Sequence, residues 1–212
     1  MRLTAHPFTL TFKRPAVTSR GALFTKQVVF LAATRADLPD VVGWGECSPM
    51  PGLSVDDFPD YVDKVQVVCG VLNAGCDALA LDLTELPSVA FGLETALRDL
   101  LTGGKQRLFG TAFSRGQAAL PTHGLIWMDD PEHVLNQVEL KAAQGCRVIK
   151  MKVGALPFEK EHALLKSIRQ RFPRDEMELR LDANGAFAPA EALEQLKRLA
   201  ELDVAFHGYQ AP

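Results

Sequence analysis

The sequence lacks the features of several protein classes. No apolar run approaches the ~20 residues that a membrane-spanning helix needs. The N-terminal stretch MRLTAHPFTLTFKRP contains no apolar core of a signal peptide. The formal net charge is −3, so Lys and Arg are not in excess. We therefore expect neither a membrane nor a nucleic acid as a partner.

Cysteine motifs and nucleotide-binding motifs are also missing. The chain has four scattered cysteines, with no CxxC pair and no His at zinc-finger spacing. We expect reduced thiols that pack as small hydrophobic side chains, as in a cytoplasmic protein. The GxG at residues 43–45 precedes a proline-rich loop, and the GGK at 103–105 lacks the other residues of a P-loop.

The first part of the chain has the pattern of antiparallel strands. Apolar alternation predicts strands around residues 8–12, 26–34 and 41–47. We expect residues 14–26 to form a polar, irregular connection. Helices are predicted from Asp56 and Asp57 towards Asn73, and from Pro87 to the glycine pair at 103–104. This part is α+β.

From about Leu120 the pattern changes to alternating strands and helices. Asp130 is predicted to be the N-cap of a helix that ends at Gly145. The arrangement indicates βαβ units and a parallel sheet. Strands are expected at residues 120–128, 146–154, 177–184 and 203–208, and helices at 130–145, 157–172 and 188–202.

Two lysines interrupt the apolar strand VIKMKVG at residues 148–154. The period of two places Lys150 and Lys152 on one face of the sheet. It also groups Arg180, Asp182 and Asn184 on one face of the next strand. Parallel sheets bind ligands at the carboxyl ends of their strands, so this positive face suggests an anionic ligand, with a metal ion at Asp182. A structural Lys–Asp ion pair between the strands is the alternative.

The order KMK followed by DANG, behind GWGECSPMPGLS and FGLETALRDL, resembles the enolase superfamily. GLIWM and IKMKVGALPFEKE are most similar to its o-succinylbenzoate synthase branch. The resemblance implies an N-terminal α+β capping domain (residues 1–115) and part of a (β/α)₈ barrel (residues 116–212).

The resemblance also implies roles for individual residues. Lys152 would be the acid/base that removes the proton α to a substrate carboxylate, and Lys150 would support it electrostatically. Asp182 would be one of three carboxylates that bind Mg²⁺. The residues implied to line the substrate pocket are Ser19, Arg20, Arg180 and Asn184.

The reaction implied is a dehydration in menaquinone biosynthesis, with a small carboxylate as the substrate. A racemase or dipeptide epimerase of the same superfamily remains an alternative. Tyr209 stands where the family has its second metal-binding Glu, and the remaining barrel strands are not in this sequence. We therefore expect a truncated chain that is inactive by itself and self-associates through an open edge at residues 204–206.

Overall fold

The computed structural model describes residues 1–18, 21–127 and 129–206. The chain divides into two compact units. Residues 1–13 and 24–120 form the first, and residues 14–23 form the second together with the chain from Pro121 onwards. The domain boundary that we expect at residue 115 stays a prediction.

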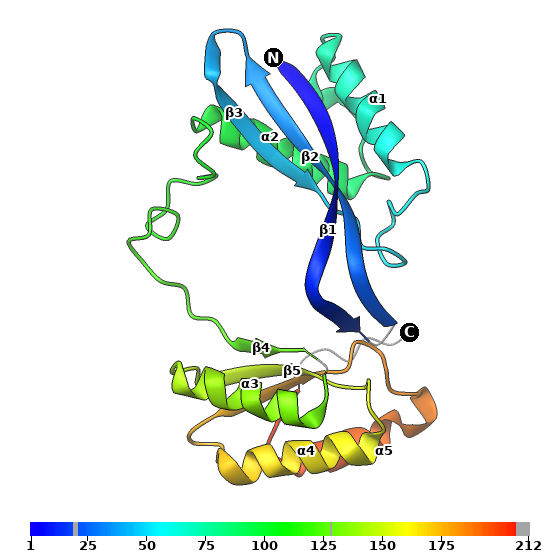
Figure 1. Ribbon diagram of the computed structural model, residues 1–212, viewed down its shortest axis with the longest axis vertical. Helices are drawn as coiled ribbons and strands as arrows, with labels where there is room; N and C mark the ends of the chain where they lie inside the picture. The colour runs from blue at the N-terminus through cyan, green and yellow to red at the C-terminus, as the bar shows by residue number, and fades with distance from the viewer. Residues whose placement is uncertain (19–20, 128, 207–212) are drawn as a thin grey trace. The chain divides into compact units, whose positions relative to one another are not determined.

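The first unit is a three-stranded sheet covered by two helices (Figure 1). Its strands lie in the order β1-β2-β3, and β2 pairs antiparallel with β3, with Val29 opposite Cys47. One face of the sheet and the helices enclose a core that includes Leu3, Leu31, Val65, Val89 and Leu93. The elements are β1 (Arg2–Thr18), β2 (Gly21–Arg35), β3 (Leu38–Cys47), α1 (Tyr61–Asn73), the 3₁₀ turn η1 (Ala78–Ala80) and α2 (Pro87–Leu101).

Helix α2 lies directly on the backbone of β3, because glycine stands at the contact points. A Cβ atom on Gly45 would lie 1.9 Å from the carbonyl oxygen of Gly92. A Cβ atom on Gly43 would lie 2.2 Å from the carbonyl oxygen of Ala96. No side chain fits at either position, so the GWGE segment is required for this packing.

Two predictions for the N-terminal part of the chain are wrong. Residues 14–26 are mostly strand rather than an irregular connection, since β1 runs to Thr18 and β2 begins at Gly21. Helix α1 begins at Tyr61, not at Asp56 or Asp57. Both carboxylates bind backbone N–H groups elsewhere: Asp56 accepts from Ser88 at 2.8 Å and Asp57 from Gly52 at 2.7 Å.

The second unit confirms the predicted parallel sheet with alternating helices. Its strands lie in the order β4-β5-β6-β7, and each neighbouring pair is parallel. Asp130 caps α3 as predicted, with its carboxylate accepting from the backbone N–H of His133 at 3.0 Å. The elements are β4 (Gly124–Ile126), α3 (Pro131–Ala143), β5 (Val148–Lys152), α4 (Phe158–Arg171), β6 (Glu178–Asp182), α5 (Pro189–Ala200) and β7 (Ala205–Phe206).

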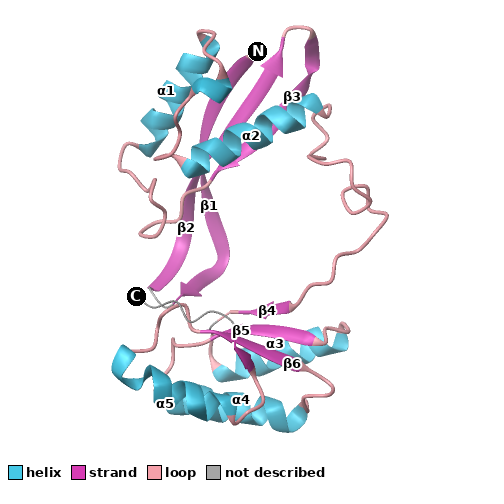
Figure 2. Cartoon of the chain, turned by 180° about the vertical axis from the view of Figure 1, so that it is seen from behind, coloured by secondary structure: helices cyan, strands magenta, loops and turns pink. Residues whose placement is uncertain are grey.

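The three helices α3, α4 and α5 lie on one face of this sheet (Figures 1 and 2). The side chains that point to them are apolar and buried: Ile149, Met151, Leu179 and Leu181. The alternate residues of β5 and β6 are only partly buried and point to the other face. The sheet therefore has an apolar helix-covered face and a polar face.

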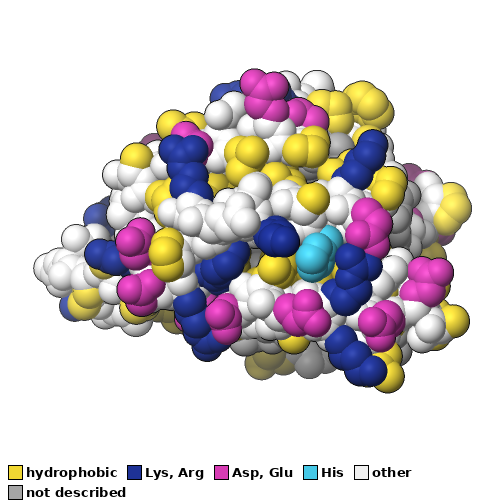
Figure 3. Space-filling view, turned by 90° about the horizontal axis from the view of Figure 1, so that it is seen from below, with side chains coloured by type: hydrophobic (Ala, Val, Ile, Leu, Met, Phe, Trp, Pro, Cys, Tyr) yellow, Lys and Arg dark blue, Asp and Glu magenta, His cyan; other side chains and the backbone are white. Residues whose placement is uncertain are grey.

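Charged side chains of both signs are interspersed on the side of the protein seen from below, where α4 and α5 lie (Figure 3). Arg198 of α5 binds Glu159 of α4 through two contacts of 2.5 and 2.8 Å. Within the described ranges, no helix has the length and apolarity needed to cross a membrane.

Candidate active site on the polar face of the parallel sheet

An ion pair joins the two central strands at the polar face. The Nζ atom of Lys150 lies 2.7 Å from Oδ2 of Asp182. The two side chains are 27% and 14% exposed, so the pair is largely shielded from water. The strand register places Lys150 opposite Arg180 and Lys152 opposite Asp182. Lys150 thus reaches diagonally to the carboxylate at the end of β6.

Asp182 is held in its charged form. Partial burial acts against ionisation. The hydrogen bond from Lys150, the backbone N–H of Asn184 and the charges of Lys150 and Lys152 outweigh that burial, so the pKa of Asp182 lies below its usual value. Asp182 in turn offsets part of the positive charge of the two lysines.

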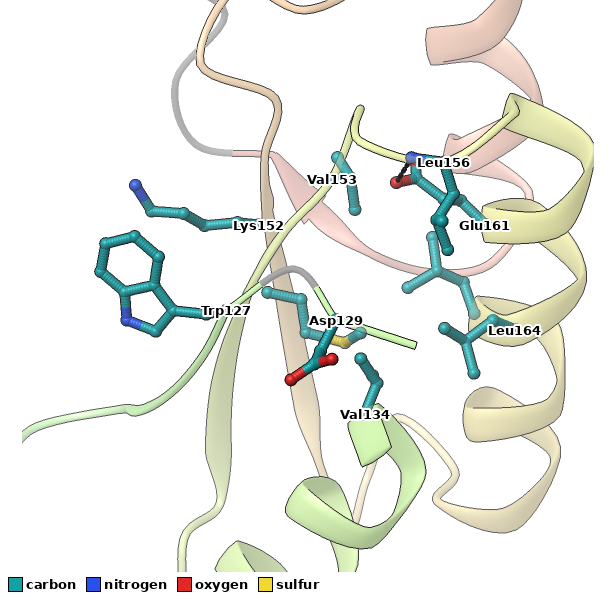
Figure 4. Close-up of a pocket in the computed structure, with 10 residues that line it drawn as sticks. Trp127, Asp129, Val134, Lys152, Val153, Leu156, Glu161 and Leu164 are labelled. Atoms are coloured by element: carbon teal, nitrogen blue, oxygen red, sulfur yellow. Dashed lines mark hydrogen bonds between the residues drawn. The ribbon is translucent and has the colours of Figure 1, made fainter. Parts of the chain in front are cut away.

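Lys152 has a different kind of neighbour. Its Nζ atom lies 4.6 Å from the centroid of the Trp127 ring, and the two side chains lie side by side in Figure 4. Within residues 1–18, 21–127 and 129–206, no carboxylate forms an ion pair with Lys152. The ammonium group is therefore available to an anionic ligand at the carboxyl end of β5.

The other predicted site residues differ in their placement. Arg180 lies on the polar face, where its Nε pairs with Glu178 at 2.6 Å. Asn184 does not continue the strand face as predicted, because β6 ends at Asp182 and Asn184 has a φ of 48°. Its backbone N–H donates to Oδ1 of Asp182 at 3.1 Å. Ser19 and Arg20 lie outside the described residues.

A buried carboxylate that we did not identify from the sequence holds the loop after Lys152. Glu161 of α4 is only 6% exposed. It accepts the N–H groups of Gly154 at 2.8 and 2.9 Å and of Ala155 and Leu156 at 3.1 Å each. Burial raises the pKa of Glu161, against these hydrogen bonds. The feature of the sequence that could have identified Glu161 is its position on the apolar stripe of α4, with Leu164, Leu165 and Ile168.

The loops that follow β5 and β6 touch each other. Gly154 has a φ of 100°, and a Cβ atom there would lie 2.3 Å from the Cβ of Ala186. Glycine is therefore needed at this position for both its backbone angle and its size. Because Glu161 fixes the first loop, it also supports the second, which begins directly after Asp182.

The described donors do not by themselves fit a Mg²⁺ ion. Mg²⁺ prefers an octahedral set of oxygen ligands. No group of three His, Cys, Asp or Glu side chains in the described part of the chain could hold a metal ion. Asp182 is the carboxylate on this face nearest the strand ends, and both its oxygens already accept hydrogen bonds. Further oxygen ligands would be needed to complete a Mg²⁺ site.

The cysteines take no part in this site. All four are free thiols. Burial raises the pKa of Cys47 to about 12, so the thiol stays protonated and is not a nucleophile.

Two protein families match different parts of the chain. The family described as MenC, N-terminal domain, matches residues 8–100. The family described as Enolase C-terminal domain-like matches residues 133–207. The first match covers most of the three-stranded sheet and its helices, and the second covers most of the parallel sheet.

A curated relative matches over the whole chain. The sequence is 37% identical over 246 aligned residues to the o-succinylbenzoate synthase of Desulfotalea psychrophila. The match includes all of this chain and 65% of that protein. The chain therefore spans slightly less than two-thirds of the length of this relative.

Solved structures share the fold. MenC from Desulfotalea psychrophila superposes with a TM-score of 0.71 at 32% identity, over 97% of this chain and 63% of that one. An o-succinylbenzoate synthase from Thermosynechococcus elongatus, with Mg in its active site, has a TM-score of 0.71 at 22% identity, over 95% and 58%. The expected fold class is confirmed: an α+β capping unit followed by part of a (β/α)₈ barrel.

Proposed function

Since the chain belongs to the enolase superfamily, we propose that its polar sheet face is the acid/base half of an o-succinylbenzoate synthase active site. The reaction would be the dehydration of 2-succinyl-6-hydroxy-2,4-cyclohexadiene-1-carboxylate to o-succinylbenzoate. The observation that carries the proposal is Lys152, an ammonium group without a carboxylate partner among the described residues, at the carboxyl end of a barrel strand.

The proposed chemistry begins with proton transfer to Lys152. In its neutral form this amine takes the proton from the carbon α to the substrate carboxylate, and the electron pair moves into that carboxylate as an enediolate. The electron pair then returns to form the ring double bond, and the C–O bond of the hydroxyl group breaks. The hydroxyl takes up the proton that Lys152 holds and leaves as water. The numbers of hydrogen atoms and charges are thus conserved in this reaction, and no other reagent is needed.

The remaining residues of the face have supporting parts in this proposal. Negative charge develops on the substrate carboxylate, and charges fixed in advance stabilise it more effectively than mobile water does. Lys150 would contribute positive charge beside Lys152, while its ion pair with Asp182 holds it in position. Arg180 and Asn184 would line the substrate pocket, together with Ser19 and Arg20.

Mg²⁺ enters this proposal only through Asp182. Bound Mg²⁺ would stabilise the negative charge of the enediolate. Asp182 would supply one oxygen ligand, and the described residues do not supply the others. We therefore assign no step to the metal ion, and we expect Mg²⁺ to bind the 212-residue chain weakly.

The test is a dehydration assay on the full product of the gene that encodes this chain. We expect formation of o-succinylbenzoate, and a loss of at least about 100-fold in kcat on Lys152→Ala, because a general base contributes roughly that much or more. Lys166→Ala is the matched control, since Lys166 is an exposed lysine on α4. Undiminished turnover by the Lys152 variant would remove this residue from the mechanism. Epimerisation of dipeptides without any dehydration would assign the protein to the alternative activity.

A further inference from the structure

We propose that Trp127 is a positioning residue for Lys152, whose ammonium group it holds over its aromatic face. The inference rests on the proposed function, because it assigns Trp127 a part in the proton transfer of Lys152. Trp127 would not touch the reacting atoms. It would limit the orientations of the lysine side chain, so that the Nζ atom stays where a substrate carbon can reach it.

The strand register brings the two residues together. Ile126 at the end of β4 lies opposite Met151 of β5. The next residues along the two parallel strands, Trp127 and Lys152, are therefore neighbours, and the Nζ atom lies 4.6 Å from the ring centroid. This is within the range of about 6 Å for a cation–π interaction, and Trp is the strongest partner among the aromatic side chains.

The charges of the face explain why an aromatic partner suits this lysine. Lys150 is paired with Asp182, and Arg180 is paired with Glu178. A lysine in a salt bridge retains its proton, because the carboxylate stabilises the ammonium form. A general base, by contrast, must be free of its proton before it can accept one from the substrate. An aromatic ring orients the lysine side chain, and it stabilises the positive charge less than a carboxylate does.

The position of Trp127 favours this role over that of a core residue. Its side chain is 43% exposed, whereas the residue before it, Ile126, is 3% exposed and belongs to the core. The indole therefore contributes little to the packing under α3 and α4. Figure 4 shows the ring beside the extended side chain of Lys152, away from Val134 and Leu164.

The first test measures the contact directly and needs no activity. Protons that lie over an indole ring are shifted upfield by its ring current. We expect the ε-methylene protons of Lys152 to resonate upfield of those of the other lysines. The signal is assigned by its loss in Lys152→Arg. Its chemical shift should become that of the other lysines in Trp127→Leu, and it should remain upfield in Trp44→Phe. Trp44 is the matched control, because its side chain is 42% exposed and it lies in the first unit.

The second test separates positioning from binding. In the dehydration assay, we expect Trp127→Leu to lower kcat by about 10-fold and leave KM unchanged, as the loss of one cation–π interaction predicts. Trp127→Phe keeps an aromatic face and should restore part of the rate. A residue with a purely structural role would not show this partial rescue, and Trp44→Phe should have the wild-type kcat.

The outcomes distinguish the two proposals. An ordinary position of the Lys152 signal in the wild type, or a wild-type kcat in Trp127→Leu, would overturn the inference about Trp127. Absence of dehydration by the wild-type protein would instead count against the proposed function. The ring-current comparison would then still decide whether Trp127 orients Lys152.

Discussion

At the scale of single residues, the ion pair between Lys150 and Asp182 depends on pH through the carboxylate of Asp182. The pKa of Asp182 is lowered from its ordinary value of 3.8. Its charged form therefore stabilises the fold at pH values above that ordinary value. This contribution is lost as the pH falls through the lowered pKa of the folded state.

We predict that Lys150→Met destabilises the protein by about 1 kcal/mol at neutral pH, since both side chains of the pair keep some contact with solvent. The difference from the wild type should decrease as the pH falls below the ordinary pKa of 3.8 and disappear below the lowered pKa of Asp182 in the folded wild type. Chemical denaturation at neutral and acidic pH measures both values. Lys166→Met is the control for loss of an exposed lysine. A difference that is the same at every pH would show that the ion pair is not its cause.

The sequence predicted some of these residues and missed others for physical reasons. The placement of Lys150, Lys152 and Asp182 on the polar face was predicted correctly, because the period of two holds as long as the strand does. The period of two failed at Asn184, because β6 ends at Asp182 and Asn184 has a positive φ. Glu161 was missed because a glutamate on an apolar stripe shows no partner in the sequence. Its partners are backbone N–H groups, which every residue type but proline has.

Among the elements, the contact between β3 and α2 depends on glycine. We predict that Gly45→Ala costs about 3 kcal/mol or more in stability, because the added Cβ would lie against the backbone of Gly92 and neither element can yield locally. Gly70→Ala in the middle of α1 should instead stabilise by about 0.5–1 kcal/mol, since no atom lies within 4 Å of the new Cβ. Thermal or chemical denaturation of both variants gives the comparison. Equal effects in the two would refute the proposed close contact.

The loop between β5 and α4 depends on Glu161. We predict that Glu161→Ala destabilises the protein by about 1–3 kcal/mol. The amides of Gly154, Ala155 and Leu156 should then exchange with solvent much faster. Hydrogen-exchange NMR on the wild type and the variant measures this. Glu194→Ala on the exposed side of α5 is the control, and it should leave these three amides unchanged.

Elements were predicted best where one face of each is buried. All three helices and all four strands of the second unit follow the predicted order, because their apolar stripes and alternations face one core. Residues 14–26 were wrongly predicted to be irregular because most of the described side chains there are exposed. Strands with few buried side chains leave no hydrophobic pattern in the sequence.

At the scale of the whole molecule, residues 102–123 lie in the chain between the helices of the first core and the parallel sheet of the second. This segment contains no helix or strand, and most of its side chains are exposed. We predict that trypsin first cleaves between Lys105 and Arg115. Mass spectrometry should then show two fragments of roughly equal size, and circular dichroism should show that they retain secondary structure. First cleavage inside α2 or β5 would contradict the predicted domain boundary at residue 115.

Tryptophan fluorescence can report on the two compact units separately, because each unit contains one of the two tryptophans. Trp44 belongs to the first unit and Trp127 to the second, and both are roughly 40% exposed. Trp44→Phe and Trp127→Phe thus leave proteins with a single fluorophore in a known unit. Their emission during denaturation would reveal whether the two cores melt together or in succession.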